Sequence, residues 1–319
     1  MSFKYKSIEE FAQFIQLKDL APKTQERYLS HIRMAGLHFG MDPAKLKEPH
    51  IKEYFLFLRN TKNYTPNSMN QSKVALQTFF HGYLKFPQWN VFPDLKIRRV
   101  DPLPVILSIQ ELRRLLRSAP TLRDQTIFTL IYNCGLRIGE CLALEVKDID
   151  SDRGLLHIRK GKGRKDRYVP ITSSVIIMLR QFWKLHKNPT LLFPSTGRHW
   201  KTFKVSKHDD DQIAKYKAMR TSNKPVSKSA IQQVMKDMVL TSGIIKGVTT
   251  HTLRHCYATH LLEAGVSIRV ISKYLGHATL NQTLVYAHLT KVSEDHTIEV
   301  LIKLLNQVSP LADKERPES

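Results

Sequence analysis

Closely spaced prolines interrupt a sequence that otherwise favours helices, and this break most constrains the fold. The prolines cannot continue a helix, and each biases the residue before it towards extended geometry; they are Pro87, Pro93, Pro102 and Pro104. The chain has 319 residues, so each side of the break is long enough to bury a core. We expect a helical domain over 1–86, a linker over 87–107 and a second domain over 108–308. A Pro- and charge-rich tail, 309–319, is expected to be disordered.

The first domain carries repeated signals for helix starts. Ser7 followed by Glu10 has the spacing of a capping box, in which each side chain accepts a hydrogen bond from a backbone N–H that the first turn leaves unpaired. Pro22 and Pro66 suit the first position of a helix, where no N–H donor is needed. Four helices are therefore predicted before residue 86.

The second domain is predicted to be mainly helical with one β-hairpin. Ser108 and Glu111 form another capping box at its start. Two β-rich stretches, 155–160 and 167–171, flank a Gly- and Lys-rich turn and predict the hairpin. Further helices are expected over 173–187, 230–242, 251–264, 267–274 and 293–307. The predicted class is mainly α with a small β-hairpin or sheet (α+β).

Charge indicates the kind of partner. Fifty Lys and Arg residues against 28 Asp and Glu give a formal charge of +22. Such an excess is typical of proteins that bind a polyanion such as nucleic acid. Six of the ten residues from Arg159 to Tyr168 are basic. The candidate DNA contacts are Arg159, Lys160, Arg164, Lys165 and Arg167 on the hairpin, and Lys23, Arg27 and Lys73 in the first domain. For any one of these, a solvated helix or turn is the alternative.

Membrane and metal sites are not predicted. The apolar runs fall far short of the ~20 residues of a membrane helix, and the N-terminus shows no secretion signal, so we expect a cytoplasmic protein. Cys134, Cys141 and Cys256 are not spaced as a zinc site, despite His251 and His255 near the last of them, and we expect no metal and no cofactor.

Four local motifs carry reactive side chains. They are Gly135-Leu136-Arg137-Ile138-Gly139-Glu140, the turn lysine Lys162, His251-Thr252-Leu253-Arg254-His255, and Leu275-Gly276-His277 with Tyr286 nine residues later. Each has an ordinary alternative: Arg137 pairing with Glu140, a solvated lysine, capping or turn histidines, a half-buried tyrosine.

Together these residues match what breaking a phosphodiester requires. Arg137 and Arg254 could hold the non-bridging oxygens of the transition state through fork-shaped guanidiniums. Tyr286 could be the nucleophile once its phenol is activated. Lys162 could protonate the departing 5′-oxygen, and His251 and His277 could hydrogen-bond the phosphate and move protons.

The ordered set Arg, Lys, His-x-x-Arg, His, Tyr resembles the tyrosine recombinase family, also called the phage integrase family. The resemblance covers nearly the whole second domain and implies that Arg137, Lys162, His251, Arg254, His277 and Tyr286 are the catalytic residues, with Glu140 bracing Arg137. It also implies a helical N-terminal core-binding domain, a catalytic domain, a 3′-phosphotyrosyl intermediate, double-stranded DNA recombination sites as partners, and no metal or nucleotide cofactor.

Two features of the second domain stand apart. Residues 197–228 hold nine Lys or Arg residues and the run Asp209-Asp210-Asp211; we expect a disordered surface loop, with a basic insertion that contacts DNA or a partner as the alternative. The predicted helix 293–307 has an apolar stripe. In the resembling recombinases such a helix docks in a neighbouring subunit, which implies a tetramer on DNA and a largely monomeric free protein; packing on its own domain is the alternative.

The resemblance implies a site-specific recombinase for integration, excision or resolution of a DNA element. Whether the element belongs to a phage, transposon, integron or resolution system stays open. One alternative is a type IB topoisomerase, which uses a similar residue set on one strand. Another is a catalytically idle DNA-binding protein of the same fold.

Overall fold

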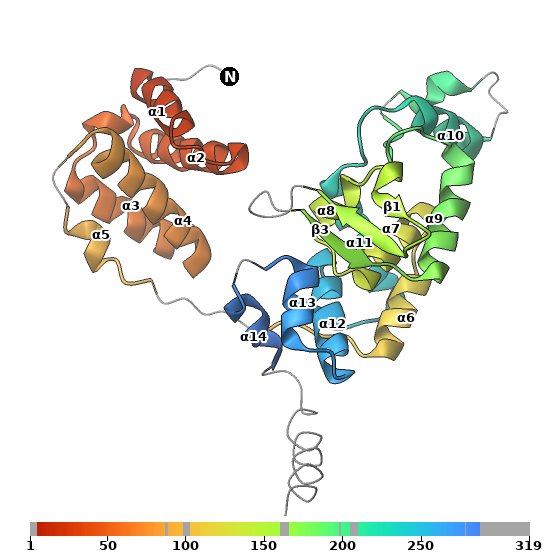
Figure 1. The fold of residues 1–319 in the computed structure, drawn as a ribbon. Coiled ribbons are helices and arrows are strands. Elements are labelled where there is room, and N and C mark those ends of the chain that lie inside the picture. Colours follow the sequence, from red (N-terminus) through yellow and green to blue (C-terminus); the bar gives the residue numbers. More distant parts are fainter. Residues whose placement is uncertain are drawn as a thin grey trace, which may run out of the picture. The chain divides into compact units, whose positions relative to one another are not determined.

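The computed structural model describes residues 5–86, 89–97, 103–159, 166–197, 199–204, 210–277 and 279–287. Its internal contacts divide the chain into two compact units, Met1–Pro102 and Leu103–Ser319 (Figure 1). Each unit has its own hydrophobic core, so each is described by itself.

The first unit is helical. Its elements are α1 (Lys6–Gln16), α2 (Pro22–Phe39), the short turn η1 (Pro43–Lys45), α3 (Glu48–Asn60), α4 (Pro66–Gln77), the π-helical turn η2 (Thr78–Tyr83) and α5 (Val91–Asp94). Phe11, Phe55 and Phe79 are fully buried in its core. Pro22 and Pro66 take the first helical positions of α2 and α4, as the sequence predicts.

The predicted capping box at Ser7 is wrong. Helix α1 begins at Lys6, two residues earlier than a cap at Ser7 would place it, and no side chain caps it. Ser7 is buried and its hydroxyl donates to the carboxylate of Asp42, while Glu10 accepts from the Tyr83 hydroxyl at 2.6 Å. Both side chains are therefore used to tie α1 to other parts of the unit.

Helix α5 lies within the stretch predicted as a linker. Phe92 is fully buried in the core of the first unit, and the Val91 amide donates to the Glu48 carboxylate at 2.7 Å. The chain thus continues to contribute to the first core after Pro87.

The second unit is mainly helical with one small sheet, and this confirms the predicted class. Its elements are α6 (Ile109–Arg117), α7 (Leu122–Asn133), α8 (Ile138–Leu142), η3 (Val146–Asp148), β1 (Ile149–Asp150), β2 (Leu155–Ile158), β3 (Arg167–Pro170), α9 (Ser173–His186), η4 (Trp200–Phe203), α10 (Asp211–Thr221), α11 (Lys228–Ser242), α12 (Thr250–Glu263), α13 (Ile268–Leu275) and α14 (Asn281–Ala287). The capping box of Ser108 and Glu111 is present at the start of α6.

The three strands form an antiparallel sheet in the order β1-β2-β3. Strands β2 and β3 are the predicted hairpin, with Leu156 opposite Val169 and Ile158 opposite Arg167. Leu156 and Val169 are fully buried, so this face of the hairpin belongs to the core.

Helix α12 is the central element for the site. It packs against α7 on one side and against α13 and α14 on another. Apolar residues of α7 and α12, among them Ile127, Ile131 and Leu253, are fully buried. The motifs that lie far apart in the sequence are therefore carried by neighbouring elements of one packed unit.

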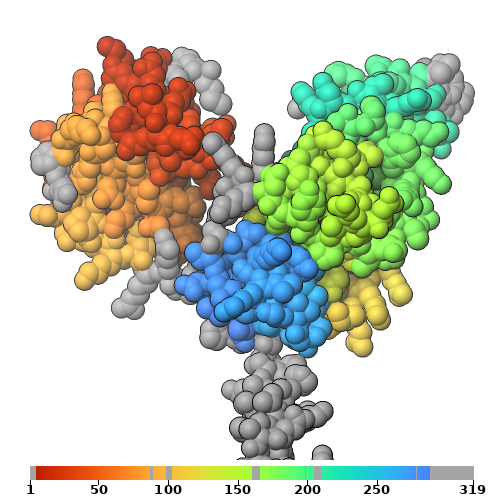
Figure 2. Space-filling model, in the orientation of Figure 1, coloured from red at the N-terminus to blue at the C-terminus, as the bar shows by residue number. Residues whose placement is uncertain are grey.

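The expectation of a disordered loop over 197–228 is wrong for most of the described part. Asp210 caps α10 by accepting from the Gln212 amide at 2.7 Å. Ala214, Ala218 and Met219 bury one face of this helix, which contacts α9 and η4. Small residues at helical spacing were the signal for this packing, hidden among the charges. Within the second unit, α10 lies at the opposite end from α13 and α14 (Figures 1 and 2).

Several predictions fall outside the described residues: the turn residues Lys160, Lys162, Arg164 and Lys165, the helix over 293–307, and the tail 309–319. In the portions that are described, no helix is both long and apolar enough to cross a membrane.

Candidate active site

Arg137 stands at a sharp turn between α7 and α8. Gly135 permits the turn because it adopts φ +59°, and a Cβ there would lie 2.4 Å from the Tyr257 ring. Arg137 then caps α8: its amide donates to Glu140 Oε2 at 2.9 Å and its Nη1 donates to Oε1 at 2.7 Å. The Arg137 side chain stays 25% exposed. The turn thus presents a guanidinium at the protein surface and fixes it from behind.

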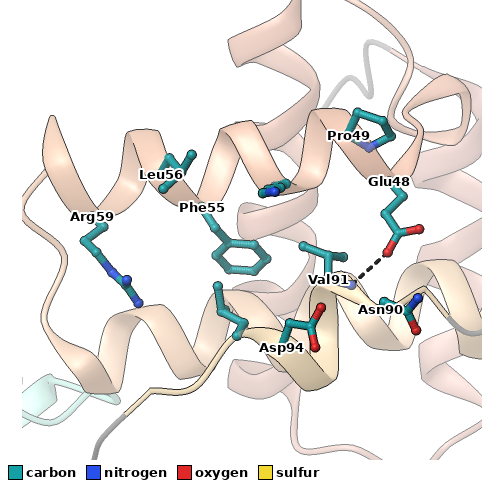
Figure 3. Close-up of a pocket in the computed structure, with 10 residues that line it drawn as sticks. Glu48, Pro49, Phe55, Leu56, Arg59, Asn90, Val91 and Asp94 are labelled. Carbon is teal, nitrogen blue, oxygen red and sulfur yellow. Dashed lines mark hydrogen bonds between the residues drawn. The ribbon is translucent and has the colours of Figure 1, made fainter.

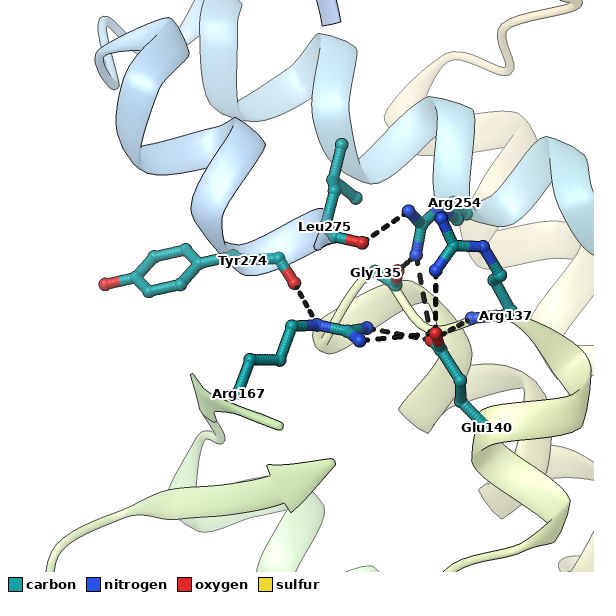
Figure 4. Close-up of polar contacts among 7 residues, drawn as sticks. All are labelled: Gly135, Arg137, Glu140, Arg167, Arg254, Tyr274 and Leu275. Atoms are coloured by element: carbon teal, nitrogen blue, oxygen red, sulfur yellow. Dashed lines mark hydrogen bonds and ion pairs between the residues drawn. The ribbon is translucent and has the colours of Figure 1, made fainter. Parts of the chain in front are cut away.

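Glu140 is the shared acceptor of two arginines (Figure 4). Arg167 Nη2 donates to Oε2 at 2.8 Å and Arg167 Nη1 to Oε1 at 3.2 Å, in addition to the contacts from Arg137. Burial alone would raise the pKa of Glu140, but the hydrogen bonds and charges of Arg167 and Arg137 outweigh it and lower the pKa to about 2. The carboxylate is therefore ionised at neutral pH.

Among the described residues, Arg254 has the largest fully buried side chain, which is 1% exposed. Its Nη1 donates to the Gly135 carbonyl at 2.7 Å and its Nη2 to the Leu275 carbonyl at 2.6 Å, while Glu140 Oε2 is 3.8 Å from Nη1 (Figure 4). Burial, followed by repulsion from Arg137, lowers the pKa of Arg254 to about 10. The guanidinium remains charged at neutral pH, held by the carbonyl of the Gly135 turn and the carbonyl of Leu275 at the end of α13.

Arg167, predicted as a DNA contact, lies in this network and is engaged by its own unit. Its side chain is 8% exposed. Besides Glu140, it donates from Nε to the Tyr274 carbonyl at 2.7 Å. Arg167 therefore joins strand β3 to α13 and α8, a role that sequence reasoning missed because its place in a basic hairpin suggested a surface charge.

A cleft of about 810 Å³ opens beside Arg137. His251, Arg159 and Lys228 also line it. Desolvation and the charges of Arg254 and Arg137 lower the pKa of His251, so its imidazole is neutral at pH 7. The cleft therefore combines cations with a neutral imidazole that can exchange a proton.

Arg159 at the edge of the cleft is paired rather than solvated. Its Nε donates to Asp148 at 2.9 Å, and its Nη2 lies 3.0 Å from Glu145 Oε1. Arg159 keeps about a third of its side chain exposed, 32%. Its predicted DNA contact thus competes with two carboxylates of its own unit.

Tyr286 lies on α14 and is 4% exposed. Its hydroxyl shares a hydrogen bond of 2.9 Å with His255 Nδ1. The centroid of the His255 ring lies 4.6 Å from the centroid of the His251 ring. Burial raises the pKa of Tyr286, although the charges of Arg254 and Arg137 oppose this. The phenol is protonated at neutral pH and needs an acceptor to react.

His255 was not predicted as a site residue. Burial, with the neighbouring His251 and Arg254, lowers its pKa to about 4, so it is neutral at pH 7. The signal was its position four residues after His251, which places both rings on one face of α12.

His277 follows the left-handed Gly276 that ends α13. Its Nδ1 hydrogen-bonds the Thr283 hydroxyl at 2.7 Å, and Thr283 is buried on α14. The described contact links the loop before α14 to the helix that carries Tyr286. Lys162, the remaining predicted catalytic residue, lies outside the described part.

The candidate DNA contacts of the first unit differ from one another. Lys23 and Arg27 are exposed on α2. Lys73 instead donates to the Leu95 carbonyl at 3.1 Å and so ties α4 to the segment after α5.

A second hollow of about 590 Å³ lies in the first unit between α3 and α5 (Figure 3). Phe55 and Leu56 form its apolar wall, with Arg59 at one end and Asp94 near the opposite wall. The hollow lacks the grouped histidines and arginines of the cleft beside Arg137.

Family models match both units. The phage integrase family model matches residues 106–292, and the model of the phage integrase N-terminal SAM-like domain matches residues 8–88. Tyrosine recombinase XerA of Thermococcus kodakarensis is 31% identical over 298 residues, covering 93% of this chain and 94% of its own length. Tyrosine recombinase XerD of Listeria innocua is 29% identical over 259 residues, covering 79% and 81%.

A solved structure shares the fold. The crystal structure of a lambda integrase dimer bound to a core site aligns with a TM-score of 0.66 at 14% identity, covering 88% of this chain and 93% of that one. At this identity the match bears on the fold alone.

Proposed function

The chain belongs to the phage integrase family of tyrosine recombinases, enzymes that cleave and rejoin DNA, and on this basis we propose that it recombines specific DNA sites through a 3′-phosphotyrosyl intermediate on Tyr286. The observation that carries the proposal is the cluster of Arg137, Arg254 and Arg167 around one carboxylate, Glu140, beside an open cleft. Three guanidiniums against one carboxylate leave a positive excess where a phosphate would bind.

The arginines would stabilise the transition state. A phosphodiester gains negative charge on its non-bridging oxygens as it becomes pentavalent, and fixed donors lower the cost of that charge. Arg137 is held by Glu140 and Arg254 by two carbonyls, so neither needs to reorganise when the charge appears. We assign both as phosphate-binding catalytic residues, with Glu140 and Arg167 positioning Arg137.

Tyr286 would attack the phosphorus and release the 5′-oxygen. The Tyr286 hydroxyl must lose its proton in this step, and its partner His255 is neutral and within hydrogen-bond distance. We assign Lys162 as the acid that protonates the 5′-oxygen, from the motif it shares with the family. His251 and His277 would hydrogen-bond the phosphate and move protons during cleavage and religation.

The partner would be double-stranded DNA at the recombination sites. The charge of +22 supports this, as does the chain's membership of a family of enzymes that cleave and rejoin DNA. We propose a tetramer in the synaptic complex, a largely monomeric free protein, and docking of the segment 293–307 in a neighbouring subunit. The enzyme would act in the cytoplasm on integration, excision or resolution of a DNA element.

A nicked suicide substrate tests the proposal. Cleavage beside a nick releases a short fragment, so religation fails and the covalent protein–DNA adduct accumulates. Wild type should form the adduct, and Tyr286→Phe should form none while binding the DNA normally, because only the attacking hydroxyl is lost. Tyr216→Phe on α10 is the matched control and should behave as wild type.

The outcomes separate the alternatives. An adduct with Tyr286→Phe would refute the assignment of the nucleophile. Absence of an adduct with wild type would favour an idle DNA-binding protein. Relaxation of supercoiled DNA without site preference, and without exchange between paired sites, would favour a topoisomerase.

A further inference from the structure

Lys228 lies directly over the turn that carries Arg137. It is the first residue of α11, and its side chain reaches across to Gly139 in α8. A Cβ added at Gly139 would lie 2.6 Å from the Lys228 Nζ and 2.9 Å from its Cε. The ammonium therefore occupies the space that the missing Gly139 side chain leaves, two residues after Arg137.

The Lys228 ammonium faces the cleft. Lys228 is exposed and lines the same cleft as Arg137 and His251. Among the residues that the structure describes, none forms an ion pair with Lys228, whereas Arg159 in the same cleft is paired with Glu145 and Asp148. Glu140, the nearest carboxylate along α8, is engaged by Arg137 and Arg167.

An uncompensated ammonium in such a place suits an anionic ligand. Lysine supplies a compact point charge with three donors, which binds one phosphate oxygen without the fixed fork geometry of arginine. The side chain comes from a different helix than Arg137 or His251, so it reaches the cleft from another wall.

We propose that Lys228 binds a backbone phosphate of the DNA strand held in this cleft, beside the phosphate that Arg137 contacts. This inference rests on the proposed function and adds a binding residue to the same site. A larger side chain at Gly139 would displace the Lys228 ammonium from this place.

Salt dependence of DNA binding tests the proposal. Affinity for a recombination site is measured for wild type, Lys228→Ala and Lys228→Arg at several salt concentrations. Removing one phosphate contact should weaken binding and reduce the log–log salt slope by about 0.9, because one fewer counterion is released. Lys228→Arg should restore the slope. Lys184→Ala, which removes an exposed lysine of α9, is the matched control and should keep the wild-type slope.

A second variant displaces the Lys228 side chain without replacing the residue. Gly139→Ala pushes aside only the flexible end of that side chain, so the protein should fold as wild type does, as judged by circular dichroism and thermal melting. Its DNA affinity should fall towards that of Lys228→Ala, and combining the two substitutions should add little, because both remove the same contact.

The overturning result is a salt slope for Lys228→Ala equal to those of wild type and Lys184→Ala. Covalent capture on the nicked substrate is measured in parallel. Failure of wild type to form the adduct refutes the proposed function, whereas a normal adduct together with an unchanged slope for Lys228→Ala refutes only the role of Lys228.

Discussion

The Tyr286 hydroxyl and His255 Nδ1 are joined by a hydrogen bond of 2.9 Å between α14 and α12. The tyrosine is protonated at neutral pH because its pKa is raised, and the histidine is neutral because its pKa is about 4. A neutral imidazole next to a phenol can take the proton that nucleophilic attack must release. His255 is therefore the best-placed acceptor among the described residues.

Replacing His255 by Leu should lower the rate of covalent capture by roughly 10²-fold, within the range of positioned proton acceptors. Without an acceptor, the reaction depends on the small fraction of Tyr286 that is already ionised. Since the pKa of Tyr286 lies above 10, this fraction and the residual rate should rise with each unit of pH between 6 and 9. Wild type should depend less on pH there, since His255 stays neutral above about 4. Equal pH profiles for the two proteins would rule out this role.

Replacing Glu140 by Ala should destabilise the protein by about 3 kcal/mol, because buried arginines lose their counterion. Asp237→Ala, which removes an exposed carboxylate of α11, should change stability by under about 0.5 kcal/mol. The pKa of Glu140 is lowered to about 2, below the ordinary value of 4.5, so its contribution is present above pH 4.5 and is lost as the pH falls towards 2. Denaturant unfolding across pH 2–7 measures it; a parallel pH dependence for Glu140→Ala and wild type would contradict the prediction.

Substituting Arg167 by Ala and substituting Arg27 by Ala should have opposite effects on protein stability and on the salt dependence of DNA binding. Arg167 holds Glu140 and the Tyr274 carbonyl, so its loss should lower stability and covalent capture and leave the salt slope of DNA binding unchanged. Arg27 is exposed on α2, so its loss should reduce the slope, by about 0.9 if it contacts one phosphate, and leave stability unchanged. A reduced slope for Arg167→Ala would instead support the original prediction that Arg167 contacts DNA.

Gly135→Ala should lower the free energy of unfolding far more than Gly243→Ala. Both glycines have positive φ, +59° and +66°, but only at Gly135 would a Cβ meet a neighbour, the Tyr257 ring at 2.4 Å. The backbone penalty alone is about 1 kcal/mol, which Gly243→Ala should show. Gly135→Ala should lose several times that in denaturant unfolding and should reduce covalent capture, because the turn positions Arg137. Similar losses for the two variants would show that the Tyr257 contact relaxes freely.

Local patterns predicted most of the second unit. The hairpin followed from β-rich stretches around a glycine-containing turn, and α12 from periodicity that the structure reproduces. Patterns failed where tertiary contacts override them: Ser7 bonds Asp42 instead of capping α1, and Phe92 is buried despite its proline-rich surroundings.

The reactive residues of the site could be predicted from the sequence, but most of the contacts between them could not. Arg137, Glu140 and Arg254 belong to recognisable motifs, and the structure brings them together. The contacts of Arg167 and His255 were not predictable, because a basic residue in a hairpin and a second histidine in a helix give the same sequence pattern whether they are buried or solvated. The packing of α14 on α12 and the position of β3 beside α13, with Arg167 paired to Glu140, distinguish the two cases.

The two hydrogen bonds that Arg254 donates to backbone carbonyls affect how the protein unfolds. If either the Gly135 turn or the end of α13 at Leu275 opened alone, a buried cation would lose an acceptor, which is costly in an apolar interior. The Gly135 turn and the end of α13 are therefore coupled into one cooperative unit with α12. Their amides should exchange with deuterated solvent only as fast as the whole catalytic unit unfolds, so the active site can be lost by melting of this unit and not by fraying of a single loop.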